Sequence, residues 1–150
     1  MSLVKISFLK NKDSWLRSFK TGLCQDGSGN YLPWMPYNLI EYLKKEIKES
    51  DEIFEYGFGT SSIFFANKAK QVTSIESNVK WHEVMTRLVK DAGVDNIETI
   101  LMEDALENEK YENAASDFEK DNPDFDGFDW IIVDSLKRAK CIKNSIKALR

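Results

Sequence analysis

The chain has 150 residues and a formal net charge of −4, with 42% hydrophobic and 12% aromatic residues. This length and composition predict one domain with a packed core, and they exclude a disordered chain. The acidic balance argues against general nucleic-acid binding, and no apolar run approaches the about 20 residues of a membrane span. Cys24 and Cys141 have neither metal nor redox spacing. We therefore expect free thiols, no metal site and a cytoplasmic location.

Residues 1–32 are predicted to form an N-terminal extension that packs on the main domain. Alternating apolar residues within 3–8 indicate an edge strand, which contains Val4, Ile6 and Phe8. A short helix should begin at Asp13 or Ser14. Its expected core-facing residues are Trp15, Leu16, Phe19 and Leu23.

Residues 33–150 are predicted to form the main domain, in which strands and helices alternate. Pro36 suits the first turn of a helix over 37–49, with Leu39, Ile40, Leu43 and Ile47 at helical spacing. Apolar runs predict strands at 53–55, 72–75, within 94–102 and at 128–134. This alternation predicts an α/β fold with a doubly wound, mostly parallel sheet.

The expected helices of this domain differ in charge and in how much of their surface is apolar. A helix from Asn78 to about Gly93 should turn Trp81, Val84, Met85, Leu88 and Ala92 inward. The acidic, helix-leaning stretch over 107–126 indicates a solvated face. The basic helix over 138–149 should present Ile142, Ile146 and Leu149 on one face.

Four acids fall at the predicted strand ends: Glu55, Glu76, Asp104 and Asp134. In open parallel sheets, ligands bind beyond the carboxyl ends of the strands. The four carboxylates are therefore expected to share one cleft.

The glycine-containing segment 53–62 restricts the kind of ligand. Gly57 and Gly59 let backbone approach a ligand closely, and Glu76, about 20 residues on, suits ribose hydroxyls. Ser62 replaces the third glycine of a dinucleotide fingerprint, and the lysine of a phosphate-binding loop is missing. Glu55 would repel a pyrophosphate, whereas it suits a ligand with an ammonium and a sulfonium.

With Glu55-x-Gly57-x-Gly59 followed by Glu76, the sequence resembles the class I S-adenosylmethionine-dependent methyltransferases. The resemblance implies S-adenosylmethionine as the cofactor, with the glycine turn facing its methionine portion and Glu76 holding the ribose. It implies that Asp104 accepts the adenine amine, with Ala105 at the same site. Ser61 stands where many relatives carry another glycine.

The resemblance extends to a subgroup with Val-Asp-Gly, Arg and Cys, which here corresponds to Val133, Asp134, Arg138 and Cys141. It implies that Asp134 lies near the methyl group and the acceptor. If the reaction needs a base, Asp134 is the leading candidate, and Arg138 is a candidate anchor for an anionic acceptor. The alternative for Arg138 is a surface charge on a basic helix. The Pro33-Trp34 pair implies that Trp34 lies near the cofactor.

The chain stops at Arg150, where such relatives continue with further strands, so the sequence predicts a domain incomplete at its C-terminal side. An exposed sheet edge is expected, and with it either a homodimer through that edge or a longer natural protein of which these residues are a fragment. The predicted function is methyl transfer to a small-molecule or glycan-related acceptor. The alternatives are a non-catalytic S-adenosylmethionine- or nucleotide-binding module and, disfavoured by Ser62, an NAD-dependent oxidoreductase.

Overall fold

A computed structural model of the chain describes residues 11–150. The expected edge strand with Val4, Ile6 and Phe8 lies outside these residues, and the domain boundary after residue 32 stays a prediction. The elements are, in chain order, α2 (Lys12–Thr21), α3 (Tyr37–Glu46), β1 (Glu52–Tyr56), α4 (Thr60–Ala66), β2 (Gln71–Glu76), α5 (Val79–Asp91), β3 (Ile97–Leu101), α6 (Glu109–Asp121), β4 (Trp130–Val133), α7 (Arg138–Ser145) and the 3-10 helix η1 (Ile146–Ala148).

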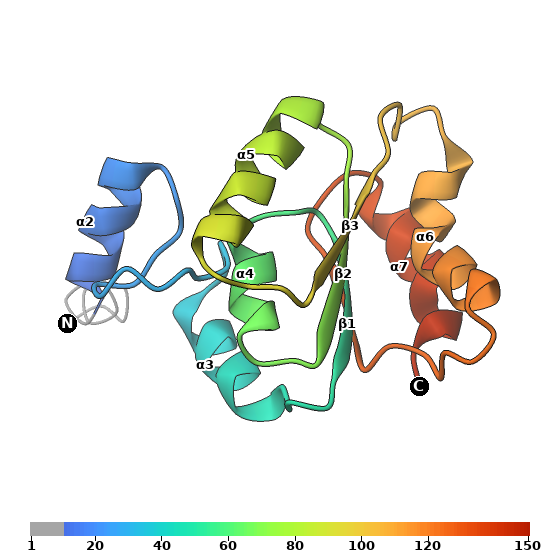
Figure 1. Cartoon of the computed structure of the whole chain (residues 1–150), viewed down its shortest axis with the longest axis horizontal. Coiled ribbons are helices and arrows are strands. Elements are labelled where there is room, and N and C mark those ends of the chain that lie inside the picture. Colours follow the sequence, from blue (N-terminus) through green and yellow to red (C-terminus); the bar gives the residue numbers. More distant parts are fainter. Residues whose placement is uncertain (1–10) are drawn as a thin grey trace.

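Within these residues the four strands form one parallel sheet in the order β3-β2-β1-β4. Figure 1 shows α3, α4 and α5 on one side of the sheet and α6 and α7 on the other. The predicted doubly wound α/β fold is thus confirmed, and the four strands lie where the sequence placed them to within a few residues. β1 is central and wholly buried, so its carboxyl end lies in the middle of the sheet edge where ligands are expected.

The core has one layer on each face of the sheet because side chains alternate along a strand. Ile53 packs in the same cluster as Ile40 of α3 and Phe65 of α4. Phe54 and Tyr56 belong to the opposite cluster, which also contains residues of α6 and α7. These two layers hold β1 rigidly on both sides and therefore fix the loop that follows it.

The predicted faces of two helices are wrong. In α2, Ser14 and Ser18 are buried, while Trp15, Leu16 and Phe19 are exposed. The reason is a local hydrogen-bond exchange: the Ser18 hydroxyl donates to the carbonyl of Gln25 at 3.1 Å and accepts from its N–H at 3.0 Å. This exchange turns the serine side of α2 toward the following loop and leaves its aromatic side outward.

In α7 and η1 the buried side chains are small: Cys141, Ser145 and Ala148. The expected apolar face is exposed instead, and it consists of Ile142, Ile146 and Leu149. Small side chains let α7 approach α6 closely, and the helices then exchange polar contacts such as Ser116 Oγ to the carbonyl of Asn144 at 2.6 Å. Leu39 of α3 and Trp81 and Val84 of α5 are likewise exposed, contrary to expectation, while Met85 is fully buried.

One acid of the stretch predicted to be solvated is buried. Glu112 of α6 is 6% exposed, and its carboxylate lies 3.1 Å from Lys137 Nζ and 3.2 Å from Lys140 Nζ. Burial disfavours the charged form, but the two lysines outweigh it and hold the pKa of Glu112 below its usual value of 4.5. This carboxylate joins α6 to α7 beneath the loop that carries Asp134.

Replacing Glu112 with Gln should therefore lower the urea midpoint at pH 7, because two lysines lose a partner that is mostly out of water. A group with a lowered pKa stabilises the fold above its unfolded pKa, and that contribution disappears as the pH falls through the folded value. The difference between the variant and the parent should thus shrink below pH 4.5. Glu109→Gln, at an exposed position of the same helix, is the control, and equal midpoints for all three proteins at pH 7 would contradict the assignment.

Candidate functional site

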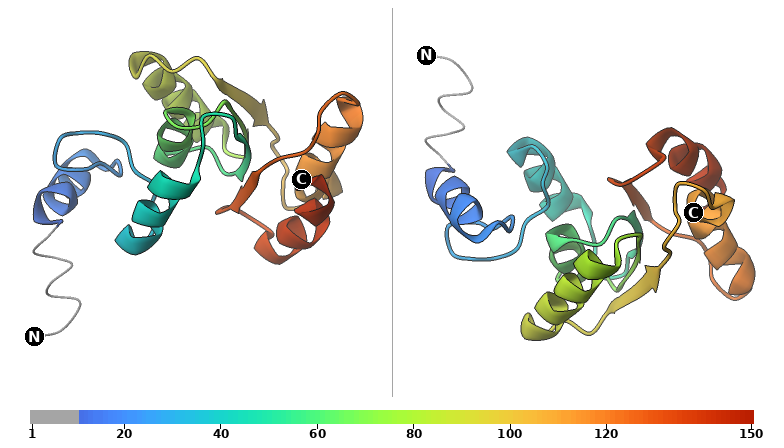
Figure 2. Two further views of the ribbon diagram at one scale, coloured as in Figure 1. Left: turned by 90° about the horizontal axis from the view of Figure 1, so that it is seen from below. Right: turned by 90° about the horizontal axis from the view of Figure 1, so that it is seen from above.

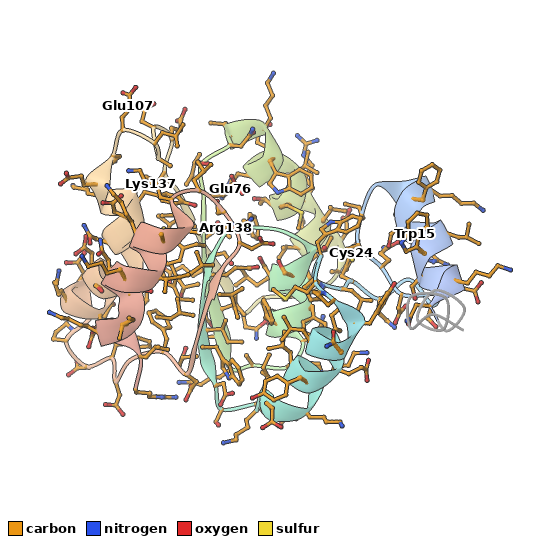
Figure 3. The ribbon with its side chains drawn as sticks, turned by 180° about the vertical axis from the view of Figure 1, so that it is seen from behind. Trp15, Cys24, Glu76, Glu107, Lys137 and Arg138 are labelled. Carbon is orange, nitrogen blue, oxygen red and sulfur yellow. The ribbon has the colours of Figure 1, made fainter. Side chains whose placement is uncertain are left out.

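A cavity of about 190 Å³ opens at the carboxyl ends of β1, β2 and β4. Seven of the ten predicted site residues line it: Trp34, Glu55, Gly57, Gly59, Ser61, Glu76 and Asp134. We call this cavity the acidic pocket. Figure 3 shows Glu76 and Arg138 toward this end of the sheet, with Cys24 and Trp15 on the α2 side of the molecule.

The turn after β1 requires a glycine. Gly57 has a φ of +122°, a conformation that other residues rarely adopt, and its N–H donates to the carbonyl of Ile75 at 2.9 Å. A Cβ at this position would lie 3.4 Å from the backbone oxygen of Asp134. The glycine thus lets the turn pass close to the end of β4, and it leaves the backbone of residues 57–59 open to a ligand.

Glu55 is the most deeply buried acid of the pocket, at 1% exposed. It accepts hydrogen bonds from the hydroxyls of Ser61, Ser62 and Ser74. Burial raises the pKa of Glu55 to about 7, the three serine hydroxyls oppose this rise, and the negative charge of Asp134 adds to it. A cation beside this carboxylate would favour its ionised form.

Glu76 ends β2 and is 8% exposed. Its Oε1 accepts from the N–H groups of Ser77 and Asn78, each at 2.7 Å, while its Oε2 accepts only a long contact of 3.3 Å from the Phe58 N–H. The backbone therefore fixes the carboxylate through one oxygen. The other oxygen retains capacity for ligand hydroxyls, as the ribose role requires.

Asp134 follows β4 and forms an ion pair with Arg138, in which Oδ1 and Nη2 are 2.7 Å apart. Arg138 Nε also donates to the carbonyl of Ser135 at 3.1 Å. Arg138 does not line the acidic pocket. It instead holds Asp134 and the start of α7 together, and its predicted role as an acceptor anchor stays a prediction.

The structure places Asp104 and Ala105 in the loop after β3, outside the walls of the pocket. Asp104 has a φ of +28°, and its carbonyl accepts from the N–H groups of Glu107 and Asn108 at 2.9 Å. At about 190 Å³ the pocket is smaller than the roughly 300–1,000 Å³ of typical small-molecule sites. A nucleoside-sized ligand would extend beyond its walls, so the adenine role of this loop stays a prediction.

The sequence reasoning missed six lining residues: Gly22, Leu23, Phe58, Thr60, Trp81 and Ser135. Trp81 is the largest of them, and its Nε1 donates to the carbonyl of Phe58 at 2.7 Å, which fixes the glycine turn from the side of α5. The sequence did contain an indication that Trp81 lies near the pocket. Asn78 caps α5 by accepting from the Trp81 N–H at 3.0 Å, and a residue in that first turn lies near the carboxyl end of the sheet.

Within the described part of the chain, three carboxylates line the acidic pocket, and none of its lining residues is Lys, Arg or His. Such a site attracts cations and repels phosphates. No group of residues within 11–150 has the arrangement of a metal site. Over the same residues no helix is both long and apolar enough to cross a membrane.

No protein-family model and no curated protein sequence matches the chain. Solved structures do match. A methyltransferase-like protein from Silicibacter pomeroyi aligns with a TM-score of 0.61 and 21% identity, covering 77% of this chain and 67% of that one. An rRNA methylase from Streptococcus thermophilus gives 0.58 and 14%, with 79% and 68% covered.

A third match is a Streptococcus mutans protein solved in complex with SAH, with a TM-score of 0.58, 11% identity, and 79% of this chain and 69% of that one covered. The likeness to these structures concerns the fold. The strand order, the glycine turn after β1 and the acid ending β2 are features of this chain itself. The chain has the Rossmann-like α/β fold of the class I S-adenosylmethionine-dependent methyltransferases, as its sequence predicted.

Proposed function

We propose that the acidic pocket binds S-adenosylmethionine and that the chain is a methyltransferase acting on a small-molecule or glycan-related acceptor. The observation that carries this proposal is the set of three carboxylates around the Gly57 turn, with no basic side chain among the lining residues that the structure describes. S-adenosylmethionine carries a sulfonium and an ammonium, so its charges complement the pocket. A nicotinamide dinucleotide would bring a pyrophosphate to the same carboxylates, which disfavours the oxidoreductase alternative.

Each residue has a physical role in this proposal. The open backbone of Gly57 and Gly59 admits the methionine portion, and Glu55 balances its positive charge. Glu76 accepts the ribose hydroxyls through Oε2. The cofactor supplies a methyl group already activated by the sulfonium, so the protein chiefly positions donor and acceptor. In this proposal Asp134, which forms an ion pair with Arg138, takes the acceptor's proton.

The acidic chain favours a small-molecule acceptor over nucleic acid, although one of the similar structures is an rRNA methylase. A homodimer through the exposed edge of β4 stays a prediction. The alternative of a non-catalytic binding module also stays a prediction. Measuring both ligand binding and turnover would distinguish such a module from an enzyme.

Thermal unfolding with added ligand tests the cofactor. At a free concentration of 100 times Kd, S-adenosylmethionine or S-adenosylhomocysteine should stabilise the fold by about 2.7 kcal/mol, seen as a raised melting temperature. NADH at the same concentration is the control and should leave the melting temperature unchanged. A folded sample that shows no shift with either adenosyl compound at millimolar concentration would refute the proposed function.

A further inference from the structure

A second cavity, of about 400 Å³, lies between α2 and α3 next to the acidic pocket. We call it the α2–α3 groove. α2 contributes Ser18 and Phe19, the following loop contributes Cys24 and Trp34, and α3 contributes Tyr37 and Ile40. Figures 1 and 2 show α2 on the outer side of α3, on the opposite side of the molecule from α6 and α7.

The groove and the acidic pocket share a wall. Trp34 lines both cavities, and it is 67% exposed, so its indole is not committed to the core. The segment around the end of α2 also serves both cavities, because Gly22 and Leu23 line the acidic pocket while Cys24 lines the groove. A molecule in the groove would therefore lie beside a ligand in the acidic pocket.

The two cavities differ sharply in charge. Among residues 11–150, ten residues line the groove, and none of these ten is Asp, Glu, Lys, Arg or His. Its small polar groups are already engaged: Cys24 Sγ donates to the carbonyl of Pro33 at 3.4 Å, and the Ser18 hydroxyl is bonded to Gln25. The described walls offer an anion no cation, and burying a charge without a partner is costly. A cation would favour the neighbouring carboxylates.

The aromatic walls and the volume of the groove further restrict the kind of molecule that fits it. Phe19, Trp34 and Tyr37 give the groove aromatic walls, and Phe19 is 80% exposed although it is a large apolar residue. Aromatic side chains favour offset or edge-on contact with another ring. The volume falls within the range of small-molecule sites, roughly 300–1,000 Å³.

We propose that the α2–α3 groove holds the methyl acceptor, an uncharged aromatic compound whose hydroxyl extends past Trp34 into the acidic pocket. The inference rests on the proposed function of the acidic pocket. The acceptor oxygen forms a bond to the methyl carbon as the carbon–sulfur bond breaks, and that electron pair stays on sulfur. The hydroxyl proton passes to Asp134, which lines the pocket that Trp34 adjoins.

The test uses 2-naphthol as the probe, measured by calorimetry with the chain saturated by S-adenosylhomocysteine. Phe19→Glu places a charge in the groove at an exposed position, so the fold should survive, and 2-naphthol should bind at least about tenfold more weakly. Leu16→Glu is the matched control, since Leu16 is also exposed on α2 but does not line the groove. It should leave the affinity unchanged. The parent protein should bind 2-naphthoate at least about tenfold more weakly than 2-naphthol.

With S-adenosylmethionine in place of the product, mass spectrometry should detect 2-methoxynaphthalene, with less of it from Phe19→Glu. The affinity for S-adenosylhomocysteine should be equal in all three proteins. Failure to bind S-adenosylhomocysteine would overturn the proposed function itself. If that ligand binds, the inference alone is overturned by any of three results: no binding of 2-naphthol, equal weakening by the two glutamate variants, or binding without methyl transfer.

Discussion

Glu55→Gln is expected to stabilise the protein by about 3 kcal/mol above pH 7, and to leave its stability nearly unchanged below pH 4.5. The pKa of Glu55 rises from 4.5 to about 7 on folding, chiefly because the carboxyl is buried. Between these values the folded state retains a proton that the unfolded state releases, so stability falls as the pH rises. This decrease in stability is complete above pH 7. The difference between the two pKa values corresponds to about 3 kcal/mol of unfolding free energy. Gln has nearly the same shape as the protonated acid but does not ionise, so the variant should not lose this stability as the pH rises.

Urea unfolding of Glu55→Gln and of the parent at pH 4.5, 6 and 8 would measure this effect. Glu83→Gln is the control, because Glu83 lies on the surface of α5 and its replacement should change stability by no more than about 0.5 kcal/mol. Parallel dependences on pH for the parent and Glu55→Gln would contradict the raised pKa.

Glu76→Gln should weaken the binding of S-adenosylhomocysteine by about 10- to 150-fold. The side chain loses its charge and presents an amide N–H₂ where Oε2 was. At least one charge-assisted hydrogen bond to the ribose is then lost, at about 1.5–3 kcal/mol. The remaining oxygen can still accept from Ser77 and Asn78 N–H, so the turn should keep its structure.

This variant is sharper than Glu76→Ala, because both lose the long Phe58 contact but only Glu76→Ala also leaves the N–H groups of Ser77 and Asn78 without their partner. Titration calorimetry measures the affinity, and the melting temperature without ligand checks the fold. Glu98→Gln on β3 is a control of the same chemistry outside the pocket. If Glu76→Gln binds S-adenosylhomocysteine with unaltered affinity, Glu76 does not hold the ribose.

The sheet and its acids could be predicted because both follow from local patterns. An apolar run that ends in an acid gives a buried strand and a polar end, and parallel strands bring such ends to one edge. Glu55, Glu76 and Asp134 therefore line one pocket as expected. Asp104 does not line it. The φ of +28° at Asp104 is a conformation that no residue pattern in this loop predicted.

The faces of α2 and α7 could not be predicted, because the spacing of large apolar residues indicates a buried face and both helices pack through small residues instead. Ser18 joins α2 to the Gln25 backbone, and Cys141 lets α7 approach α6. The α2–α3 groove follows from the packing of α2 through its serine side, because this packing leaves Phe19 exposed. The shared wall at Trp34 also depends on contacts between segments that the sequence does not place relative to one another.

The position of Trp81 gives the protein an optical reporter of its own. The chain has four tryptophans, and two of them, Trp34 and Trp81, line the acidic pocket, whereas Trp15 and Trp130 do not. Because Trp81 Nε1 donates to Phe58, its indole is held at a fixed orientation beside the ligand's entrance. A bound adenine or sulfonium would change the emission of these two indoles. Occupancy of the pocket can therefore be followed in unlabelled protein by fluorescence, and single Trp→Phe replacements would separate the contribution of each.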